Sequence, residues 1–284
     1  MPRIAYVNGR YVPHATGQVH IEDRGFQFAD GVYEVCAVRG GQLIDEEPHL
    51  RRLDRSLNEL RMRSPVGSAA LRHVMRETVR RNRVADGLVY VQISRGVAPR
   101  DHGFPSAETE PTLVVTARSI ALEKYAAWAA TGVKVVTIPE SRWARCDIKS
   151  TALLANVLAK QHAREKGAFE SWFVDRDGFV TEGASTNAWI VDAAGKLRTR
   201  PLGHAILPGI TRGEILPLCR QLGIELDERA FTVEEAKAAR EAFLTAASIG
   251  VLPITAVDDC KIGTGRPGPI AARLGEAYWT SRSE

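Results

Sequence analysis

The sequence predicts an α+β protein of two domains, and three observations point to this fold class. Short runs of alternating apolar and polar residues, typical of β-strands, occur along most of the 284-residue chain. Asparagine–glycine, glycine–glycine and aspartate–glycine pairs separate neighbouring runs and indicate antiparallel hairpins. Two arginine-bearing segments with helical spacing interrupt the first group of strands. Helices inserted among antiparallel strands are typical of the α+β class.

The first predicted domain covers residues 1–119. It begins with a hairpin, IAYV and RYVP around Asn8-Gly9, and continues with strands in GVYEVCAVRGGQLI around Gly40-Gly41. The two helices follow within 51–63 and 72–83, and then strands at 88–96 and 111–119. Leucines at helical spacing give the first helix one apolar face: Leu50, Leu53, Leu57 and Leu60.

Residues 120–131 are predicted to be a connector, and 132–284 the second domain. This domain begins with the strand VKVVTIPE, followed by a helix after Lys149 whose predicted buried face consists of Leu153, Leu154, Val157 and Leu158. Hairpins are predicted at Asp177-Gly178 and Ala194-Gly195, a helix from about Thr211, a strand at 241–248 and a C-terminal helix. GTGRPG (263–268) matches G-x-G-x-x-G but lacks a βαβ unit, so a turn is predicted there.

The composition favours a soluble, cytoplasmic protein. Hydrophobic residues make up 44% and charged residues 25%, close to the average for globular proteins. No apolar run approaches the roughly 18 residues that span a bilayer, and the N-terminus does not resemble a signal peptide. Four widely separated cysteines form no CxxC pair, so we expect no disulfide framework, no metal site and a reducing compartment: Cys36, Cys146, Cys219 and Cys260.

The net charge of +4 does not indicate a nucleic-acid partner. The arginines concentrate in 51–63 and 72–83, where we interpret most of them as the solvated faces of helices. A nucleic-acid surface would add interleaved aromatic residues or a known module.

Lys149 raises a question about chemistry, because it precedes a predicted helix start, where a cation is disfavoured by roughly 0.3–1 kcal/mol. A solvated lysine is the ordinary explanation. However, the chain also has Glu182 in the small, polar turn TEGASTN, a helix start at ILPGITR that could bind an anion, and Arg100 and His102 in the loop PRDHGFP. An amine, a carboxylate and an anion site suit pyridoxal 5′-phosphate, which needs a Schiff-base lysine, a partner for its ring nitrogen and a phosphate cradle.

Six motifs then establish a resemblance over nearly the whole chain: EDRGFQFADGVYEV (22–35), PHLRRL (48–53), RGVAPRDHGFP (95–105), RWARCDIKS (142–150), VTEGASTN (180–187) and ILPGITR (206–212). The chain resembles the fold-type IV pyridoxal-phosphate enzymes, a branched-chain-aminotransferase-like family, and within them the D-amino-acid aminotransferases. The resemblance implies a smaller N-terminal α/β domain, a larger C-terminal domain with a β-barrel-like core, and a homodimer. It also implies transamination between a D-amino acid such as D-alanine and a 2-oxo acid such as 2-oxoglutarate.

The resemblance also implies residue roles. Lys149 would form the Schiff base and move protons, Glu182 would bind the pyridine nitrogen, and Arg142 would support Glu182. Five positions would hold the phosphate: Arg52, Ile210, Thr211, Ala246 and Ala247. Three would bind the substrate α-carboxylate, the last two from the partner subunit: Tyr33, Arg100 and His102.

The chain departs from the family pattern at Ala247, where a hydroxyl residue is usual, at Gly250 in place of a glutamate, and at Ala37 in place of a lysine or arginine. These departures leave open a branched-chain L-amino-acid transaminase or an (R)-amine transaminase, and less readily an aminodeoxychorismate lyase. A non-catalytic cofactor-binding or nucleic-acid-binding protein is the alternative from another class.

Overall fold

The computed structural model describes residues 3–282 and divides the chain into two compact units. The first unit contains the chain up to Ala121 together with Ile148–Ala152, and the second contains Leu122–Asp147 and the chain from Leu153 onward. The segment predicted as a connector contains helix α4 (Leu122–Thr131), which belongs to the second unit. Within 3–282, no helix combines the length and the apolar character that crossing a membrane requires.

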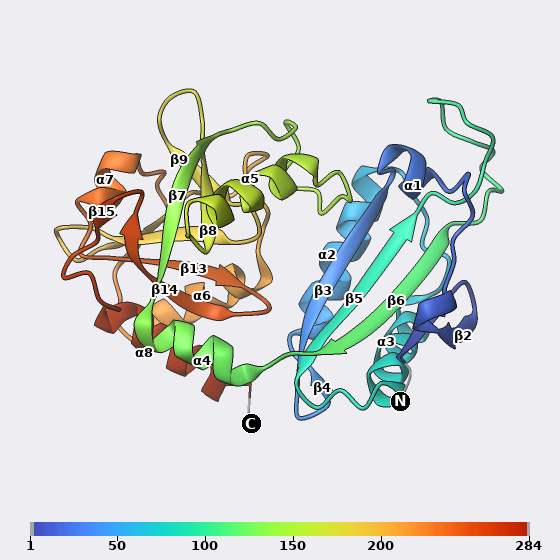
Figure 1. The fold of residues 1–284 in the computed structure, drawn as a ribbon, viewed down its shortest axis with the longest axis horizontal. Helices are drawn as coiled ribbons and strands as arrows, with labels where there is room; N and C mark the ends of the chain where they lie inside the picture. The colour runs from blue at the N-terminus through green and yellow to red at the C-terminus, as the bar shows by residue number, and fades with distance from the viewer. Residues whose placement is uncertain (1–2, 283–284) are drawn as a thin grey trace. The chain divides into compact units, whose positions relative to one another are not determined.

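The first unit is built on a six-stranded antiparallel sheet with the order β2-β1-β6-β5-β3-β4 (Figure 1). Its strands are β1 (Ile4–Val7), β2 (Arg10–Pro13), β3 (Gly31–Arg39), β4 (Gln42–Leu43), β5 (Gly87–Ser94) and β6 (Thr112–Ser119). The predicted hairpin at Asn8-Gly9 is confirmed, since β1 pairs with β2 and both turn residues have positive φ. A short helical turn η1 (His14–Thr16) and helix α1 (Arg24–Phe28) connect β2 to β3.

Helices α2 (Glu46–Glu59) and α3 (Ser68–Arg81) cover one face of this sheet (Figure 1). Leu50, Leu53 and Leu57 are buried against it, as predicted. Arginines on the outer side of these helices pair with glutamates of α2 or α3. For example, Arg76 of α3 binds Glu46 of α2. The arginine-rich composition of this region therefore has an ordinary electrostatic explanation.

The second unit contains a nine-stranded mixed sheet with the order β12-β11-β10-β13-β14-β7-β8-β9, and β15 pairs with β14. Its strands are β7 (Val133–Pro139), β8 (Glu170–Val174), β9 (Val180–Gly183), β10 (Asn187–Val191), β11 (Leu197–Thr199), β12 (Leu226–Asp227), β13 (Glu241–Ala246), β14 (Gly250–Val257) and β15 (Cys260–Lys261). Both predicted hairpins are confirmed, with Gly178 and Gly195 at positive φ in their turns. The interior strand β7 is parallel to both of its neighbours, β14 and β8.

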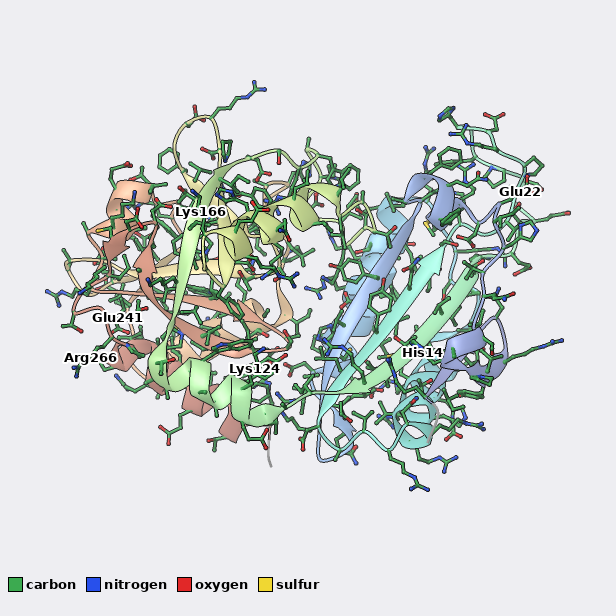
Figure 2. The ribbon with its side chains drawn as sticks, in the orientation of Figure 1. His14, Glu22, Lys124, Lys166, Glu241 and Arg266 are labelled. Carbon is green, nitrogen blue, oxygen red and sulfur yellow. The ribbon has the colours of Figure 1, made fainter. Side chains whose placement is uncertain are left out.

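Four further helices belong to this unit: α5 (Leu154–Glu165), α6 (Ile210–Gln221), α7 (Val233–Lys237) and α8 (Pro269–Thr280). Helix α5 packs on β8, α6 packs on β13 and α8, and α8 packs on β14. Glu241, labelled in Figure 2, starts β13 and accepts hydrogen bonds from Ile270 N and Ala271 N, which fixes the first turn of α8. GTGRPG is a turn before α8, as predicted.

The predicted buried face of the helix after Lys149 is wrong. Leu154, Val157 and Leu158 are 73%, 59% and 61% exposed, and Leu153 lies before the helix as its N-cap. The buried positions of α5 are instead Ala159 and Ala163. Ala159 packs with Phe173 and Ala184, because small side chains let the helix approach β8 closely. The larger apolar side chains of α5 therefore face outward.

Candidate cofactor and substrate site

Lys149 is positioned by β-type pairing with the start of β3. Tyr33 N donates to Lys149 O over 3.0 Å, and Thr151 N donates to Gly31 O over 2.9 Å. Between these bonds, Ser150 forms an isolated bridge with Val32. Because α5 begins only at Leu154, Lys149 is outside the helix and the helix-dipole argument for its unusual position does not apply. A strand partner fixes its backbone instead.

The Lys149 amine lies over an aromatic column. Lys149 Nζ is 4.1 Å from the centroid of the Tyr33 ring, and that ring stacks on Tyr90 at 5.6 Å. Burial, assisted by the neighbouring Tyr33 hydroxyl, raises the pKa of Tyr90 to about 12. The Tyr90 hydroxyl therefore stays protonated and donates to Gln92 Oε1 at 2.7 Å. Two of the predicted site residues, Lys149 and Tyr33, are thus brought into contact.

Arg52 points inward from α2, whereas the side chain of Arg51 is 65% exposed. Its guanidinium donates to both oxygens of Glu34 on β3, over 2.7 and 2.8 Å, and His49 Nδ1 lies 2.7 Å from the same carboxylate. Burial acts to raise the pKa of Glu34, but the charge and hydrogen bonds of Arg52 lower it well below its usual range. Glu34, whose carboxylate is also held by His49, thus fixes the plane of the guanidinium.

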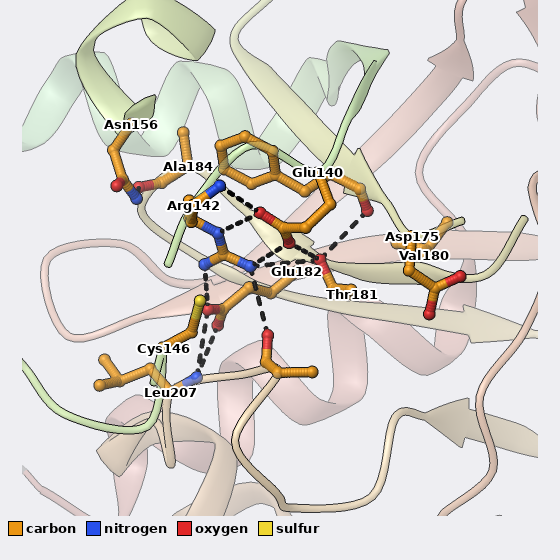
Figure 3. Close-up of polar contacts among 12 residues, drawn as sticks. Glu140, Arg142, Cys146, Asn156, Asp175, Val180, Thr181, Glu182, Ala184 and Leu207 are labelled. Atoms are coloured by element: carbon orange, nitrogen blue, oxygen red, sulfur yellow. Dashed lines mark hydrogen bonds and ion pairs between the residues drawn. The ribbon is translucent and has the colours of Figure 1, made fainter. Parts of the chain in front are cut away.

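The predicted carboxylate Glu182 is buried at the end of β9 and is 4% exposed. Figure 3 shows its contacts with Arg142 and Leu207. Arg142 Nη1 donates to Glu182 Oε1 at 2.5 Å, Asn187 Nδ2 donates to Oε2 at 2.9 Å, and Leu207 N lies 3.1 Å from both oxygens. Three donors stabilise the anionic form of this carboxylate.

Arg142 lies between two carboxylates. Its backbone N, Nε and Nη2 bind Glu140 over 2.7–3.0 Å, while Nη1 binds Glu182. Burial acts to raise the pKa of Glu140, but Arg142 and Thr181 together lower it. Arg142 also lies over the Phe173 ring at 4.4 Å. The predicted contact between Arg142 and Glu182 is therefore present within the second unit.

The start of α6 lies directly after the loop that binds Glu182. Gly209 is its N-cap and supplies no side-chain cap, so the N–H groups of Ile210 and Thr211 point out of the helix without partners inside it. A Cβ at Gly209 would lie 2.0 Å from Asn187 Oδ1, so only glycine permits this close approach. The buried Thr211 Oγ1 is 3.4 Å from the hydroxyl of Tyr278.

Ala246 ends β13, and Ala247 begins the turn to β14. Ile249 N donates to Ala246 O at 3.1 Å, and methyl side chains leave only backbone polar groups in this part of the turn. The departure at Gly250 has a steric basis, since the residue has φ +64° and a Cβ there would lie 2.7 Å from Trp279 Nε1.

Arg100 and His102 lie on an exposed loop of the first unit. Both contact the Phe28 ring, Arg100 at 5.1 Å and His102 at 5.4 Å. Within residues 3–282, no hydrogen bond, ion pair or ring contact joins either one to Tyr33 or Lys149. These two predicted residues are therefore not brought together with the others by such contacts.

Three positioning residues were missed in the sequence: Glu34, Glu140 and Asn187. The only signal for Glu34 was a carboxylate inside the apolar strand VYEVCAV, where it is 2% exposed. Conversely, Cys146 is not an activated nucleophile, since burial raises the pKa of its thiol to about 11. Residues 3–282 contain no cluster of metal-ligating side chains.

Residues 31–257 match the family model for amino-transferase class IV, and the chain belongs to this family. It is therefore a fold-type IV aminotransferase that uses pyridoxal 5′-phosphate, and the predicted fold, enzyme class and cofactor are confirmed.

The relatives of the chain span almost its full length. It is 39% identical over 274 residues to a D-alanine aminotransferase of Bacillus licheniformis, covering 96% of this chain and 95% of the relative. It is 36% identical to a D-alanine aminotransferase of Staphylococcus haemolyticus, with the same coverage.

Among solved structures, the branched-chain amino acid aminotransferase of Escherichia coli matches with a TM-score of 0.89, covering 99% of this chain and 95% of that one. At 24% identity this match concerns the fold alone. The branched-chain aminotransferase of Thermoproteus uzoniensis, at 26% identity, matches with a TM-score of 0.86 and covers 98% and 94% of the two chains.

Proposed function

We propose that the protein transfers an amino group between a D-amino acid, such as D-alanine, and a 2-oxo acid, such as 2-oxoglutarate. The D-amino acid leaves as its 2-oxo acid in the first half-reaction, and the second 2-oxo acid leaves as a D-amino acid in the other. The near full-length similarity to D-alanine aminotransferases supports this choice of substrate. The geometric observation that carries the proposal is the buried Arg142–Glu182 pair.

Glu182 is proposed to bind the pyridine nitrogen. Pyridoxal phosphate, when bound, supplies an electron sink for charge that develops at the substrate α-carbon. That role requires a proton on the ring nitrogen, and a carboxylate kept anionic by Arg142, Asn187 and Leu207 N is suited to accept its hydrogen bond. The donor set of this buried carboxylate therefore fits the cofactor.

The phosphate is proposed to be held by Arg52, by the N–H groups of Ile210 and Thr211, and by the backbone of Ala246 and Ala247. An uncapped helix start favours an anion through its N–H groups and its dipole. The tight contact of Gly209 with Asn187 supports this role, because it leaves no side chain at the N-cap to occupy the anion position.

Lys149 is proposed to bind the cofactor covalently through Nζ. After the substrate amine has replaced it, Nζ would take the proton from the substrate α-carbon and deliver it to the cofactor carbon. The Tyr33 ring lies beside Nζ at 4.1 Å and supports this role by holding the amine in a fixed position.

The substrate α-carboxylate is proposed to bind Tyr33 of one subunit and Arg100 and His102 of the partner in a homodimer. Two features support a homodimer. Arg100 and His102 are exposed on their own unit, and apolar side chains are exposed on both units, among them Ile21 and Phe26 at 75% each and Leu154 at 73%. A cytoplasmic location is proposed with it, since all four cysteines are free.

The test is a titration of the cofactor-loaded protein with D-alanine. The visible absorption band of the cofactor is monitored during the titration, and L-leucine is the control. We expect loss of the band with D-alanine only, and no turnover in Lys149→Ala. If only L-leucine bleaches the absorption band, the protein is a branched-chain L-amino-acid transaminase instead. Normal turnover in Lys149→Ala would remove the lysine from the mechanism.

A further inference from the structure

Arg24, the first residue of α1, is a buried arginine that binds the loop carrying Arg100 and His102. Its exposed fraction is 3%. Nη1 donates to the backbone oxygen of Asp101 at 2.6 Å, and Nη2 lies 3.5 Å from the backbone oxygen of His102. The guanidinium therefore contacts the backbone of the loop that carries Arg100 and His102. These two residues form the proposed carboxylate trap, the part of the partner's site that would bind the substrate α-carboxylate.

The charge of Arg24 is balanced at its other edge. Nε donates to Asp30 Oδ2 at 2.8 Å, and Asp30 also accepts two hydrogen bonds from Arg95. Burial acts to raise the pKa of Asp30, but these arginines outweigh it and lower the pKa. A planar guanidinium can serve the carboxylate and the carbonyl groups at once, which a single ammonium group cannot do with the same geometry.

The side chains of the trap rest on the same helix. Arg24, Arg100 and His102 all contact the ring of Phe28, at 4.9, 5.1 and 5.4 Å. The backbone of the loop is also attached here. Arg24 N donates to Gly96 O at 2.9 Å, and Ala98 N donates to the carbonyl of Glu22, which Figure 2 labels.

The loop needs such an attachment because it has little structure of its own. Residues 95–111 contain no helix and no strand beyond an isolated bridge at Val97, and residues 99–104 are exposed. A loop that is ordered before the ligand arrives gives up less conformational freedom on binding. The contacts of Arg24 supply that order at Asp101 and His102.

We propose that Arg24 is a positioning residue for the substrate α-carboxylate, holding the Arg100–His102 loop in its binding conformation through the Asp101 and His102 carbonyl groups. This inference rests on the proposed function, in which that loop completes the partner's site. Arg24 itself touches neither the substrate nor the cofactor in this scheme.

The experiment compares Arg24→Lys with the parent as cofactor-loaded dimers. We expect the D-alanine concentration that half-saturates bleaching to rise at least tenfold, while the limiting rate changes less than threefold. The dissociation constant of the cofactor, measured by reconstitution of the apoprotein, should stay within twofold. Arg200→Lys is the matched control, because Arg200 also joins an aspartate, Asp175, to a backbone carbonyl, that of Val180; its half-saturation should not change.

Arg100→Ala separates this inference from the proposed function. If Arg100→Ala raises the half-saturating concentration and Arg24→Lys does not, the positioning role is overturned while the trap stands. If Arg100→Ala has no effect, the carboxylate trap itself is wrong. In the double variant, Arg24→Lys should add less than twofold to Arg100→Ala; a full multiplicative effect would indicate general destabilisation and overturn the proposal.

If Arg24→Lys does not fold, Phe28→Leu serves in its place. Leucine keeps an apolar contact in the half-buried position but removes the ring under Arg100 and His102. The same rise in half-saturation at an unchanged limiting rate is expected. An unchanged half-saturation in this variant would count against the loop attachment.

Discussion

At the scale of single residues, the central feature is a guanidinium between two carboxylates. Arg142 binds Glu140 through three nitrogens and Glu182 through one. Glu140 therefore fixes the side-chain orientation of Arg142 and offsets part of its charge. The two carboxylates touch the same arginine but have separate proposed roles, which substitution can distinguish.

Replacing Glu182 with glutamine should lower kcat with D-alanine at least 100-fold, an effect similar to the loss of a preorganised electrostatic contact. A neutral amide cannot hold a proton on the pyridine nitrogen. Steady-state kinetics and cofactor content give the measurement. Glu140→Gln is the control and should lose tenfold or less, since Glu140 acts only through Arg142. Equal losses in the two variants would contradict the separate roles.

Glu34 should make the stability of the first unit depend on pH. Its pKa is lowered from about 4.5 when folded, so its stabilising contribution is complete above pH 4.5 and is lost as the pH falls toward the folded pKa. Glu34→Gln should therefore be less stable at pH 7, by about 3–5 kcal/mol for a broken buried pair. It should also lose less further stability between pH 5 and pH 3 than the parent.

Urea unfolding of the apoprotein at several pH values measures this effect. The exposed substitution Glu165→Gln should follow the parent at every pH. If Glu34→Gln and the parent declined in parallel below pH 5, the Glu34–Arg52 pair would not be the source of the pH dependence.

At the scale of elements, local turn chemistry was predictable and long-range pairing was not. The hairpins at Asn8-Gly9 and Asp177-Gly178 followed from residues that adopt positive φ. The assignment of Arg52 to the phosphate came from the resemblance to the family, since helical spacing alone marked only the leucines of this helix. The strand partner of Lys149 could not be predicted, because Val32 and Ser150 are far apart in the sequence and nothing local marks their pairing. The apolar stripe of α5, formed by Leu154, Val157 and Leu158, was also recognisable in the sequence. Its spacing did not indicate which surface covers it, and these side chains are exposed in the single chain.

The stripe on α5 should contribute to dimerisation. Burying a large apolar side chain contributes roughly 1.5–3 kcal/mol, and Leu158 is 61% exposed in the single chain. We expect Leu158→Glu to increase the fraction of monomer at micromolar concentration, as measured by light scattering after size-exclusion chromatography. Leu202→Glu changes a residue that is 56% exposed and lies outside α5, so it should leave the dimer intact. If neither variant forms monomer, α5 is not part of the dimer interface.

At the scale of the whole molecule, the chain crosses from one unit to the other three times. Ile148–Ala152 belongs to the first unit, although its neighbours on both sides belong to the second. Ile148 is 4% exposed within the core of the first unit. Lys149, the proposed Schiff-base lysine, thus lies in a short segment of the first unit whose chain continues into the second unit at both ends.

A fragment that ends at Ala121 should consequently be destabilised. It lacks Ile148 from its core and the strand partner of the start of β3. We expect a lower melting temperature by circular dichroism than for the same fragment carrying residues 146–153 on a flexible glycine–serine linker. Identical melting of the two fragments would show that the segment contributes nothing to the first unit.

The contact between Gly209 and Asn187 restricts how this protein can evolve. Any side chain at 209 collides with Asn187, which at the same time binds Glu182 and Leu207. A change at 209 alone loses the helix start, and a change at 187 alone removes a donor from the buried carboxylate. We therefore expect a single substitution at either position to weaken the site, and a tolerated change to alter both positions together. Variation under selection should therefore accumulate elsewhere, in the exposed loops and on the outer helix faces.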